Sequence, residues 1–357
     1  MRLTVVVPTY NRSELLGRAL RGLLDQTLPA EEYEIVVVDD GSTDATPQVV
    51  AAVGAPESRL RYLRQENQGP AAARNYGTRE AKGNIILFTG DDCLPDRKLL
   101  EVHLQTHARK GDVGVIGLVA WHPELEVTPF MSFLEEGVQF GFKHIRDPEH
   151  APFWCFYTSN CSVQKHRLEE VGGFDTGFPA AAFEDIELAY RMQQRGLRLV
   201  YRSAAVTYHH HATTLERYLA RQRLAGQAAV VFWRKHPELS KKLGIEAAAQ
   251  PYTVARFYHA MLEYTYSLGV REALRTGKAP LEDESAPLWR DAELIESGRA
   301  WIYEVFGGED PVRHELNALR EEYERITSRR LYRLSEAIAR LGWGVLHALG
   351  LGRRPKL

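Results

Sequence analysis

The chain has 357 residues, a formal net charge of −2 and a hydrophobic fraction of 44%. It is long enough to bury one large core, or one core with a smaller appended unit. The near-neutral charge argues against nucleic acid as a main partner, because a protein that binds the phosphate backbone needs a basic surface.

The cysteines and the start of the chain predict a cytoplasmic protein. Cys93, Cys155 and Cys161 are odd in number and lack metal-ligand spacing, so we expect a reducing compartment. A strand is predicted almost directly after Met1, which leaves no room for a signal peptide. No apolar run approaches the roughly 18 residues of a membrane span.

The first half of the chain alternates between predicted strands and helices. Strands are predicted at residues 3–7, 35–38 and 85–88, and helices at residues 13–24, from near Pro47 and at residues 69–81. Ser13 is expected to cap the first helix. The strands are apolar throughout, which indicates that both of their faces are covered. This alternation predicts a parallel sheet.

The second half is less regular, and the end of the chain is predicted to be helical. In chain order we expect a strand at residues 113–120, a helix or ordered loop at 129–142, a strand at 159–163, a turn at 172–175, a helix at 184–195, short strands at 198–201 and 205–208, and a helix at 213–235. We place a domain boundary near Pro237. It separates a first domain, residues 1–236, from a helical region, residues 237–357. The first domain has halves at residues 1–120 and 121–236, and the helical region has a linker-like stretch at residues 276–287.

Acidic side chains follow two of the predicted strands. Asp91 and Asp92 end the strand at residues 85–88, and Asp39 and Asp40 end the strand at residues 35–38. Ligands of open α/β sheets collect at the carboxyl ends of parallel strands. Two carboxylates 4 Å apart repel by about 4 kcal/mol at an effective dielectric constant of 20, so we expect a divalent cation that carries a phosphate ester. The alternative is a solvated loop with a helix cap at Asp96.

Further polar residues fit a nucleotide diphosphate. The helix that begins near Gly69 offers backbone N–H groups, and Arg74 lies one turn into it. Taken singly, Gly69 also fits a plain turn and Arg74 a solvated surface charge. In the second half, Glu184 and Asp185 open a helix, where carboxylates commonly act only as dipole partners.

Three consecutive histidines end the predicted strand at residues 205–208. The alternation of a strand sends His209 and His211 to one face and His210 to the other. One histidine of that pair can complete a metal shell begun by Asp92. A core histidine with satisfied hydrogen bonds or a zinc site are the alternatives, although no cysteine lies nearby in the sequence to build a structural zinc cage.

Taken in order, these motifs resemble the family 2 glycosyltransferases of the GT-A fold. The matching stretches are Val5–Arg12, Val36–Asp44, Asn67–Asn75, Asp91–Asp92, Ser159–Val163, Gly172–Asp175, Glu184–Arg191 and Tyr208–His209. The resemblance covers about residues 2 to 235. It implies an α/β fold with a Rossmann-like, mostly parallel sheet flanked by helices, followed here by a helical C-terminal extension.

The resemblance implies a metal-assisted, inverting transfer of a sugar from a nucleotide diphosphate to an acceptor hydroxyl. It assigns Asp185 as the general base and Asp92, with His209 and His211, as the ligands of Mg²⁺ or Mn²⁺. The nucleotide would be bound by Pro8, Thr9, Tyr10, Arg12, Asp39, Gly69, Arg74 and Asp91. The sugar and the acceptor would be bound by Trp154, Asn160 and Glu184. The expected donors are UDP-, dTDP- or GDP-sugars, and the expected acceptor is a glycan or a lipid-linked glycan.

One residue departs from the family pattern. The family often has a further acidic residue where this chain has Gly90, so that Gly-Asp-Asp replaces Asp-Xaa-Asp. The substitution implies that metal dependence is weakened or altered, while Asp92 keeps the metal role.

Two other functions fit parts of the sequence. A nucleotidyltransferase that makes sugar nucleotides uses a similar α/β half, but it needs a glycine-rich loop that Pro8–Asn11 does not provide. A non-catalytic module that binds nucleotide sugars is suggested by Gly90 and by the long tail. The Arg-rich tail from Arg325 fits three alternatives. It contacts the anionic inner face of a membrane, it pairs with a second copy of the chain, or it packs on its own catalytic domain.

Overall fold

The computed structural model describes residues 2–54, 59–178 and 181–245. The chain divides into two units, residues 1–246 and 247–357. The predictions for the tail, including the linker-like stretch at residues 276–287, lie outside the described residues. Within the described part, no helix combines the length and the apolar character that crossing a bilayer requires.

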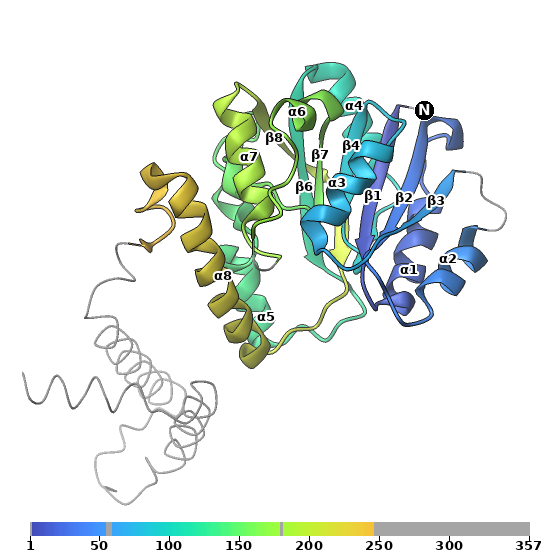
Figure 1. The fold of residues 1–357 in the computed structure, drawn as a ribbon, viewed down its shortest axis with the longest axis horizontal. Helices are drawn as coiled ribbons and strands as arrows, with labels where there is room; N and C mark the ends of the chain where they lie inside the picture. Colours follow the sequence, from blue (N-terminus) through green and yellow to red (C-terminus); the bar gives the residue numbers. More distant parts are fainter. Residues whose placement is uncertain (1, 55–58, 179–180, 246–357) are drawn as a thin grey trace, which may run out of the picture. The chain divides into compact units, whose positions relative to one another are not determined.

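A mixed eight-stranded sheet in the order β3-β2-β1-β4-β7-β6-β8-β5 forms the centre of the described part (Figure 1). The elements of the first half are β1 (Leu3–Thr9), α1 (Ser13–Leu24), η1 (Ala30–Glu32), β2 (Tyr33–Asp39), α2 (Thr46–Gly54), β3 (Leu60–Arg64), α3 (Pro70–Glu80), β4 (Ile85–Thr89), β5 (Cys93–Pro95) and α4 (Leu99–Lys110). Those that follow are β6 (Val113–Trp121), α5 (Pro129–Phe133), η2 (Leu134–Val138), η3 (Gly141–His144), η4 (Phe153–Cys155), β7 (Asn160–Gln164), α6 (Lys165–Glu170), α7 (Glu184–Gln194), β8 (Arg198–His209), α8 (Leu215–Lys235) and η5 (Pro237–Leu239).

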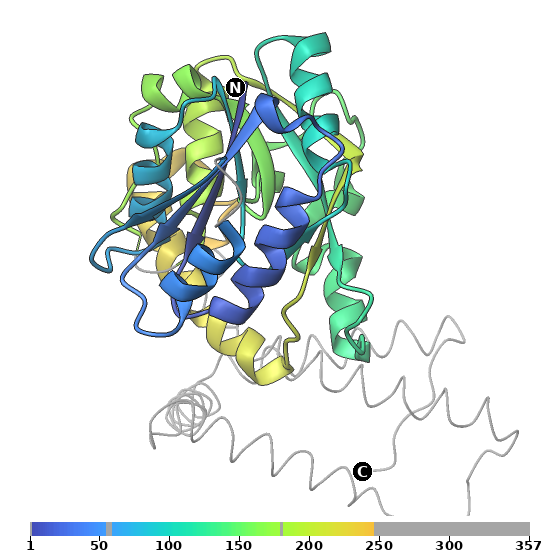
Figure 2. The ribbon, with the colours of Figure 1, turned by 90° about the vertical axis from the view of Figure 1, so that its right-hand side faces the viewer.

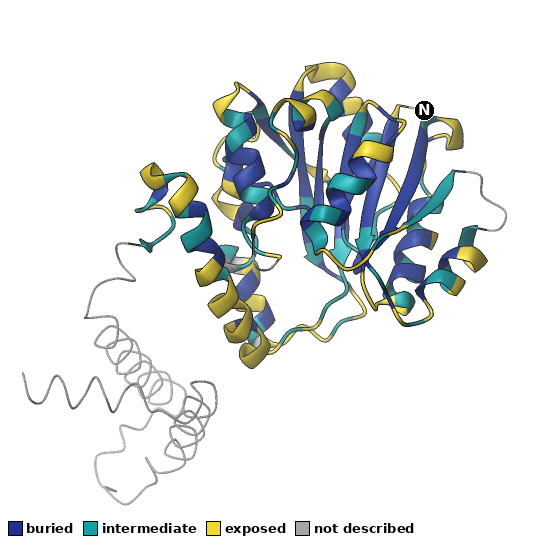
Figure 3. Cartoon of the chain, in the orientation of Figure 1, coloured by how far each residue is buried: buried dark blue, intermediate teal, exposed yellow. Residues whose placement is uncertain are grey.

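Helices cover both faces of the sheet, as the continuous apolar runs of β1 and β2 predict. Val5 and Val7 of β1 pack with the leucines of α1 and α4, whereas Val6 packs with α3 and α7 on the opposite face. Figure 2 shows α1 and α3 on opposite sides of the strands, and Figure 3 shows the strands of the sheet as the most buried part. The predicted α/β architecture is therefore confirmed within the described residues.

The direction of β7 brings site residues from the two halves of the domain to the same edge of the sheet. Strands β3, β2, β1 and β4 are parallel, whereas β7 runs antiparallel to β4 and to β6. In the β4–β7 register Thr89 faces Asn160, so the residues that precede β7 lie beside the residues that follow β4. The Thr89 hydroxyl donates a hydrogen bond of 3.1 Å to the carbonyl of Ser159 across this edge.

Several local predictions differ from the structure. Strands β3 and β5 were not predicted, because β3 is only half buried and β5 has three residues. The two short strands predicted at residues 198–201 and 205–208 form one strand, β8, and the break in its pattern is a register shift opposite Gly117 of β6. Ser13 does not cap α1; its N–H instead donates to Asp44 Oδ2 at 2.9 Å, and Arg12 occupies the N-cap position.

A pair of helical glycines tests how closely α3 packs on the sheet. A Cβ atom on Gly77 of α3 would lie 2.6 Å from Val6 Cγ1, whereas one on Gly226 of α8 would meet nothing within 4 Å. We expect Gly77→Ala to lower the free energy of unfolding by about 1–3 kcal/mol, because β-branched valines cannot move aside. Gly226→Ala should raise it by about 0.5–1 kcal/mol through helix propensity. Chemical denaturation of both variants checks this, and equal effects would contradict the packing.

Candidate functional site

Asp91 and Asp92 follow β4 and share one cation from α1. Arg12 Nη1 lies 3.2 Å from Asp91 Oδ1 and 2.7 Å from Asp92 Oδ2. The Thr9 hydroxyl donates to Asp91 Oδ2 at 2.8 Å. Both carboxylates are buried. The predicted convergence of Thr9, Arg12 and the acidic pair, hereafter Asp91 with Asp92, is therefore present at the carboxyl ends of β1 and β4.

The two carboxylates of the acidic pair differ in their affinity for protons. Burial and then the charge of Asp92 raise the pKa of Asp91 to about 6, against the opposing effects of Arg12 and Thr9. For Asp92, burial favours the protonated form, but the hydrogen bond to His209 and the charges of His209 and Arg12 outweigh it and hold the pKa well below its usual range. Asp92 therefore stays ionised at neutral pH and is the carboxylate suited to a cation.

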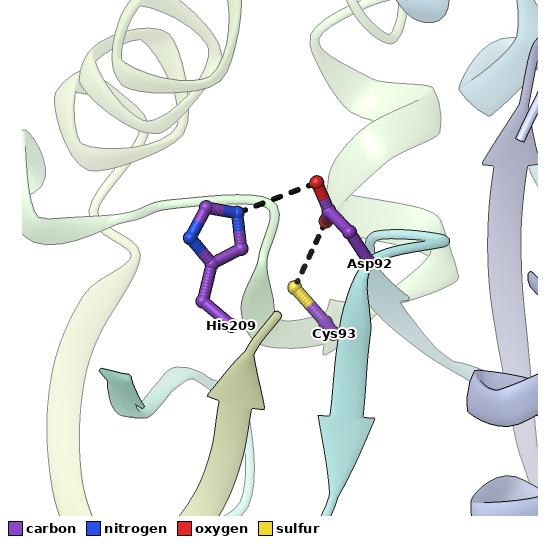
Figure 4. Close-up of side chains that lie close together, drawn as sticks. All are labelled: Asp92, Cys93 and His209. Atoms are coloured by element: carbon purple, nitrogen blue, oxygen red, sulfur yellow. Dashed lines mark hydrogen bonds and ion pairs between the residues drawn. The ribbon is translucent and has the colours of Figure 1, made fainter. Parts of the chain in front are cut away.

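Pairing between β5 and β8 brings a histidine and a thiol to Asp92. Cys93 faces His209 in the register of these strands. His209 Nε2 lies 3.4 Å from Asp92 Oδ2, and Cys93 Sγ lies 3.6 Å from Asp92 Oδ1 (Figure 4). Burial, followed by the charge of Asp92, raises the pKa of the Cys93 thiol well above its ordinary value, so the thiol keeps its proton.

The residues around Asp92 fit a divalent cation. The ligand atoms of Asp92, Cys93 and His209 all lie within 4.8 Å of one another. A carboxylate oxygen and an imidazole nitrogen at this spacing can hold one ion between them, whereas a sulfur ligand suits soft ions such as Zn²⁺ better than Mg²⁺ or Mn²⁺. The pair Asp92 and His209 thus supplies two ligands, and a bound diphosphate and water would have to supply the others.

The other two histidines separate as the strand alternation predicts. The ring of His211 lies 5.7 Å from that of His209, on the side of the acidic pair. His210 lies with His122 and Glu124, where its Nε2 is 3.1 Å from Arg18 Nη1. These three residues form a second group of potential ligands, separate from Asp92.

Asp39 accepts hydrogen bonds from residues that were not predicted from the sequence to be its partners. Its Oδ1 accepts the Ser42 N–H at 2.7 Å, and its Oδ2 accepts the Tyr62 hydroxyl. Burial and then the hydrogen bond to Asp39 raise the pKa of Tyr62 to about 12. Arg64 Nη1 lies 3.8 Å from Asp39 Oδ2. Tyr62 and Arg64 belong to β3, and only the β2–β3 register, in which Asp39 faces Arg64, could have indicated them.

Asp40 holds the turn that precedes α3. The N–H groups of Gln68 and Gly69 donate to the carboxylate of Asp40 at 2.9 and 2.8 Å. Gly69 has φ +86°, a conformation that favours glycine at this turn. Asp40 therefore takes up the Gly69 N–H, while nucleotide binding by the N–H groups at the start of α3 stays a prediction.

Arg74 contacts Glu184 rather than the acidic pair. Its Nη1 donates to Glu184 Oε1 at 2.8 Å, and its guanidinium lies 5.6 Å from the centre of the Phe174 ring. Both partners of this ion pair are buried. The pair joins α3 to the first turn of α7, so Arg74 positions Glu184. Support of the nucleotide by Arg74 stays a prediction.

Asp185 lies at the same sheet edge as the acidic pair. Its Oδ2 accepts the N–H of Thr158 at 3.1 Å, and its Oδ1 accepts the N–H of Ile186 at 2.8 Å. Thr158 immediately precedes Ser159, whose carbonyl is bonded to Thr89 at the end of β4. Two N–H donors therefore orient the Asp185 carboxylate beside the residues that lead to Asp91.

An aromatic side chain connects the surroundings of His209 with those of Asp185. The ring of Phe140 lies 6.2 Å from that of His209 and 5.1 Å from that of Tyr157. Tyr157 is adjacent in sequence to Thr158, which holds Asp185. Apolar walls of this kind suit the stacking of a sugar ring.

The remaining predicted residues have separate positions. Asn160 is buried, and its amide donates to the carbonyls of Leu118 and Ala205, both at 2.9 Å. It therefore bridges the irregular part of the β6–β8 pairing, which contradicts its predicted contact with the acceptor. Trp154 in η4 is half exposed, with Lys242 Nζ 4.8 Å from its ring centre. Pro8 lies within β1 opposite Val38.

Tyr10 and Gly90 lie next to residues of the acidic site in the sequence. Tyr10 directly follows β1 and is 47% exposed, as a residue that lines an open site must be. A Cβ atom on Gly90 would lie 2.7 Å from Asp92 Oδ1 and 3.2 Å from Cys93 Sγ. A larger residue at position 90 would therefore displace the Asp92 side chain from its present position.

The buried Glu184 carboxyl predicts a pH-dependent stability. Burial and then the charge of Asp185 raise its pKa to about 7, against the effect of Arg74. Between about pH 4.5 and pH 7 the folded chain holds a proton that the unfolded chain has released, so the free energy of unfolding falls as the pH rises. We expect wild type to lose about 1–3 kcal/mol relative to Glu184→Gln between about pH 5 and pH 8 in urea denaturation. Parallel profiles would contradict the assignment.

Comparison with known proteins identifies relatives of the first unit. Residues 4–167 match the model of the family described as glycosyl transferase family 2. Validoxylamine A glucosyltransferase of Streptomyces hygroscopicus subsp. jinggangensis (strain 5008) is 34% identical over 267 residues, which are 68% of this chain and 62% of that protein. The chain thus spans less than two thirds of the length of this relative.

Two solved structures share the fold. Mannosyltransferase PcManGT from Pyrobaculum calidifontis, in complex with GDP-Man and Mn²⁺, has a TM-score of 0.55 and 24% identity, covering 88% of this chain and 82% of that chain. TarS 1-349 of S. aureus, in complex with UDP, has a TM-score of 0.50 and 19% identity, covering 80% and 95%. These likenesses confirm that the described part has the GT-A type of α/β fold.

Proposed function

Residues 4–167 place this chain in glycosyl transferase family 2, and from that membership we propose that it transfers a sugar from a nucleotide diphosphate to an acceptor hydroxyl. The observation that carries the proposal is the position of Asp185 at the same sheet edge as the acidic pair. A donor bound at Asp91 and Asp92 would then have its sugar directed toward Asp185. Binding both substrates at this edge would align donor and acceptor, which lowers the entropic part of the barrier.

The donor nucleotide would lie across the ends of β1, β2 and β4. In the proposal, Thr9 and Tyr10 line the base and the ribose, Asp39 accepts a base N–H, and Asp91 faces the ribose. The proposal is supported by the exposure of Tyr10 beside the acidic pair. Asp39 is fully buried and bonded to Ser42 and Tyr62, so contact with a base requires one of these bonds to change.

Mg²⁺ or Mn²⁺ would be held at Asp92 and His209, close to His211. Bound there, the cation would neutralise charge on the leaving diphosphate. The similar fold of PcManGT is solved with GDP-Man and Mn²⁺, which supports testing manganese first. We propose a UDP-, dTDP- or GDP-sugar as the donor and a glycan or a lipid-linked glycan as the acceptor.

Asp185 would act as the general base. Its carboxylate would take the proton from the acceptor hydroxyl as that oxygen attacks the anomeric carbon from the face opposite the diphosphate. Bonds from the N–H groups of Thr158 and Ile186 keep this carboxylate oriented. The neighbouring Glu184 is unsuited to the role, because it is buried and paired with Arg74. A single carboxylate acting as base corresponds to inversion at the anomeric carbon.

Activity with nucleotide sugars tests the proposed reaction. We expect the purified chain, with Mn²⁺ and a panel of UDP-, dTDP- and GDP-sugars, to release nucleoside diphosphate in the presence of an acceptor. Release of pyrophosphate from a sugar phosphate and a nucleoside triphosphate would instead identify a nucleotidyltransferase. Donor binding without turnover of any member of the panel would identify a binding module.

Substitution of the proposed base should affect turnover more than donor binding. Asp185→Asn keeps the size of the side chain and its ability to accept the Thr158 N–H, but it cannot take a proton. We expect kcat to fall by about 10²- to 10⁴-fold with little change in the KM for the donor. Asp25→Asn makes the same change at an exposed carboxylate after the end of α1 and should leave kcat unchanged. A kcat within a few-fold of wild type for Asp185→Asn would exclude it as the base.

Removal of the metal should abolish most of the activity. Excess chelator is expected to stop turnover, and added Mn²⁺ or Mg²⁺ to restore it. Asp92→Asn should raise the Mn²⁺ concentration required for half-maximal activity by roughly tenfold or more, since one of two protein ligands loses its charge. His122→Ala, in the second ligand group, should leave that concentration unchanged. Full activity in chelator would refute the metal assignment.

A further inference from the structure

We propose that Arg12 is an internal competitor for the divalent cation: it neutralises the acidic pair in the donor-free protein and leaves Asp92 for the diphosphate when metal and donor bind. The inference rests on the proposed function. It assigns to Arg12 a positioning role and a movement, both of which follow from the contacts at the end of β4.

The oxygen that the metal needs is the oxygen that Arg12 holds. Asp92 Oδ2 is the oxygen that approaches His209 Nε2, at 3.4 Å, while Oδ1 is turned toward Cys93 Sγ. Arg12 Nη1 lies 2.7 Å from this same Oδ2. An ion shared by Asp92 and His209 would therefore occupy the side of the carboxylate that the guanidinium now contacts.

Arg12 also covers the acidic pair from solvent. The side chain of Arg12 is 43% exposed, whereas those of Asp91 and Asp92 are 8% and 12% exposed. The guanidinium is thus the outer group of the cluster and the carboxylates are the inner groups. A divalent ion at Oδ2 would meet the guanidinium on the same side of the carboxylate, where the two positive charges repel each other.

The backbone at Arg12 is anchored, which restricts the movement to the side chain. The carbonyl of Arg12 accepts the N–H of Leu16 at 3.0 Å at the start of α1, and the next residue, Ser13, is bonded through its N–H to Asp44. The Arg12 side chain makes no capping bond to the helix. Rotation about its side-chain bonds can therefore release Asp92 without disturbing α1.

The chemistry of a guanidinium favours a phosphate group as its second partner. Its planar set of N–H donors matches phosphate oxygens in pairs, more specifically than an ammonium does. A diphosphate bound through a metal at Asp92 would bring such oxygens within a side-chain length of Arg12. Arg12 thus exchanges one anionic partner for another, and the net charge of the cluster is unchanged because the divalent cation offsets the diphosphate.

Binding of Mn²⁺ alone tests the competition, because it requires neither donor nor turnover. We would measure free Mn²⁺ by electron paramagnetic resonance for the full chain and for Arg12→Gln, without nucleotide. Removal of the competing cation leaves two carboxylates without their partner, so Arg12→Gln should bind Mn²⁺ at least roughly tenfold more tightly than wild type. Arg21→Gln, which removes the same charge from an exposed position of α1, should bind as wild type does.

A second variant covers the case in which Arg12→Gln fails to fold. Arg12→Lys keeps the charge as a single ammonium and should keep Mn²⁺ affinity within about threefold of wild type, while the KM for a donor rises because paired contacts to phosphate are lost. Unchanged or weaker Mn²⁺ binding by Arg12→Gln would overturn the inference, as would tenfold tighter binding by Arg12→Lys. Absence of turnover with every nucleotide sugar, by contrast, would overturn the proposed transfer and leave the measured competition standing.

Discussion

The antiparallel pairing of β7 with β4 is the constraint on which the site depends. If β7 ran parallel to its neighbours, the residues before it would lie at the opposite edge of the sheet, far from the acidic pair. Because Thr89 faces Asn160, the chain enters β7 beside the residues that leave β4. Asp185 is bonded to Thr158 at this entry, so one reversal of strand direction joins a carboxylate near residue 90 with another near residue 185.

Each acidic centre of the site is balanced by an arginine from another element. Arg12 contacts both members of the acidic pair, and Arg74 contacts Glu184 next to the proposed base. Buried carboxylates without such partners would take up protons or destabilise the fold. The two arginines differ in exposure: Arg74 is buried in a fixed bridge between α3 and α7, whereas Arg12 lies at the surface. The first is suited to hold geometry and the second to move.

The sequence was sufficient to predict the elements whose signal is local. The apolar runs of β1, β2 and β4, and the carboxylates that end them, follow from composition and strand periodicity, and the order of the motifs indicated the family. Side-chain partners could not be predicted, because they depend on contacts between distant residues. Arg74 and Asn160 have the residue types expected of ligand-binding groups, yet Arg74 pairs with Glu184 and Asn160 bridges two strands. Strand β3, which supplies Tyr62, lacks a strong apolar pattern.

The proposed reaction requires that a diphosphate and its cation bind at the carboxyl end of β4. Diffraction from crystals grown with Mn²⁺ and a nucleoside diphosphate, measured at the manganese absorption edge, tests it most directly. We expect an anomalous peak within coordination distance of Asp92 and His209, with the diphosphate on the side that faces Asp185. A nucleotide bound with its manganese at His122, Glu124 and His210, or away from the acidic pair altogether, would contradict the account.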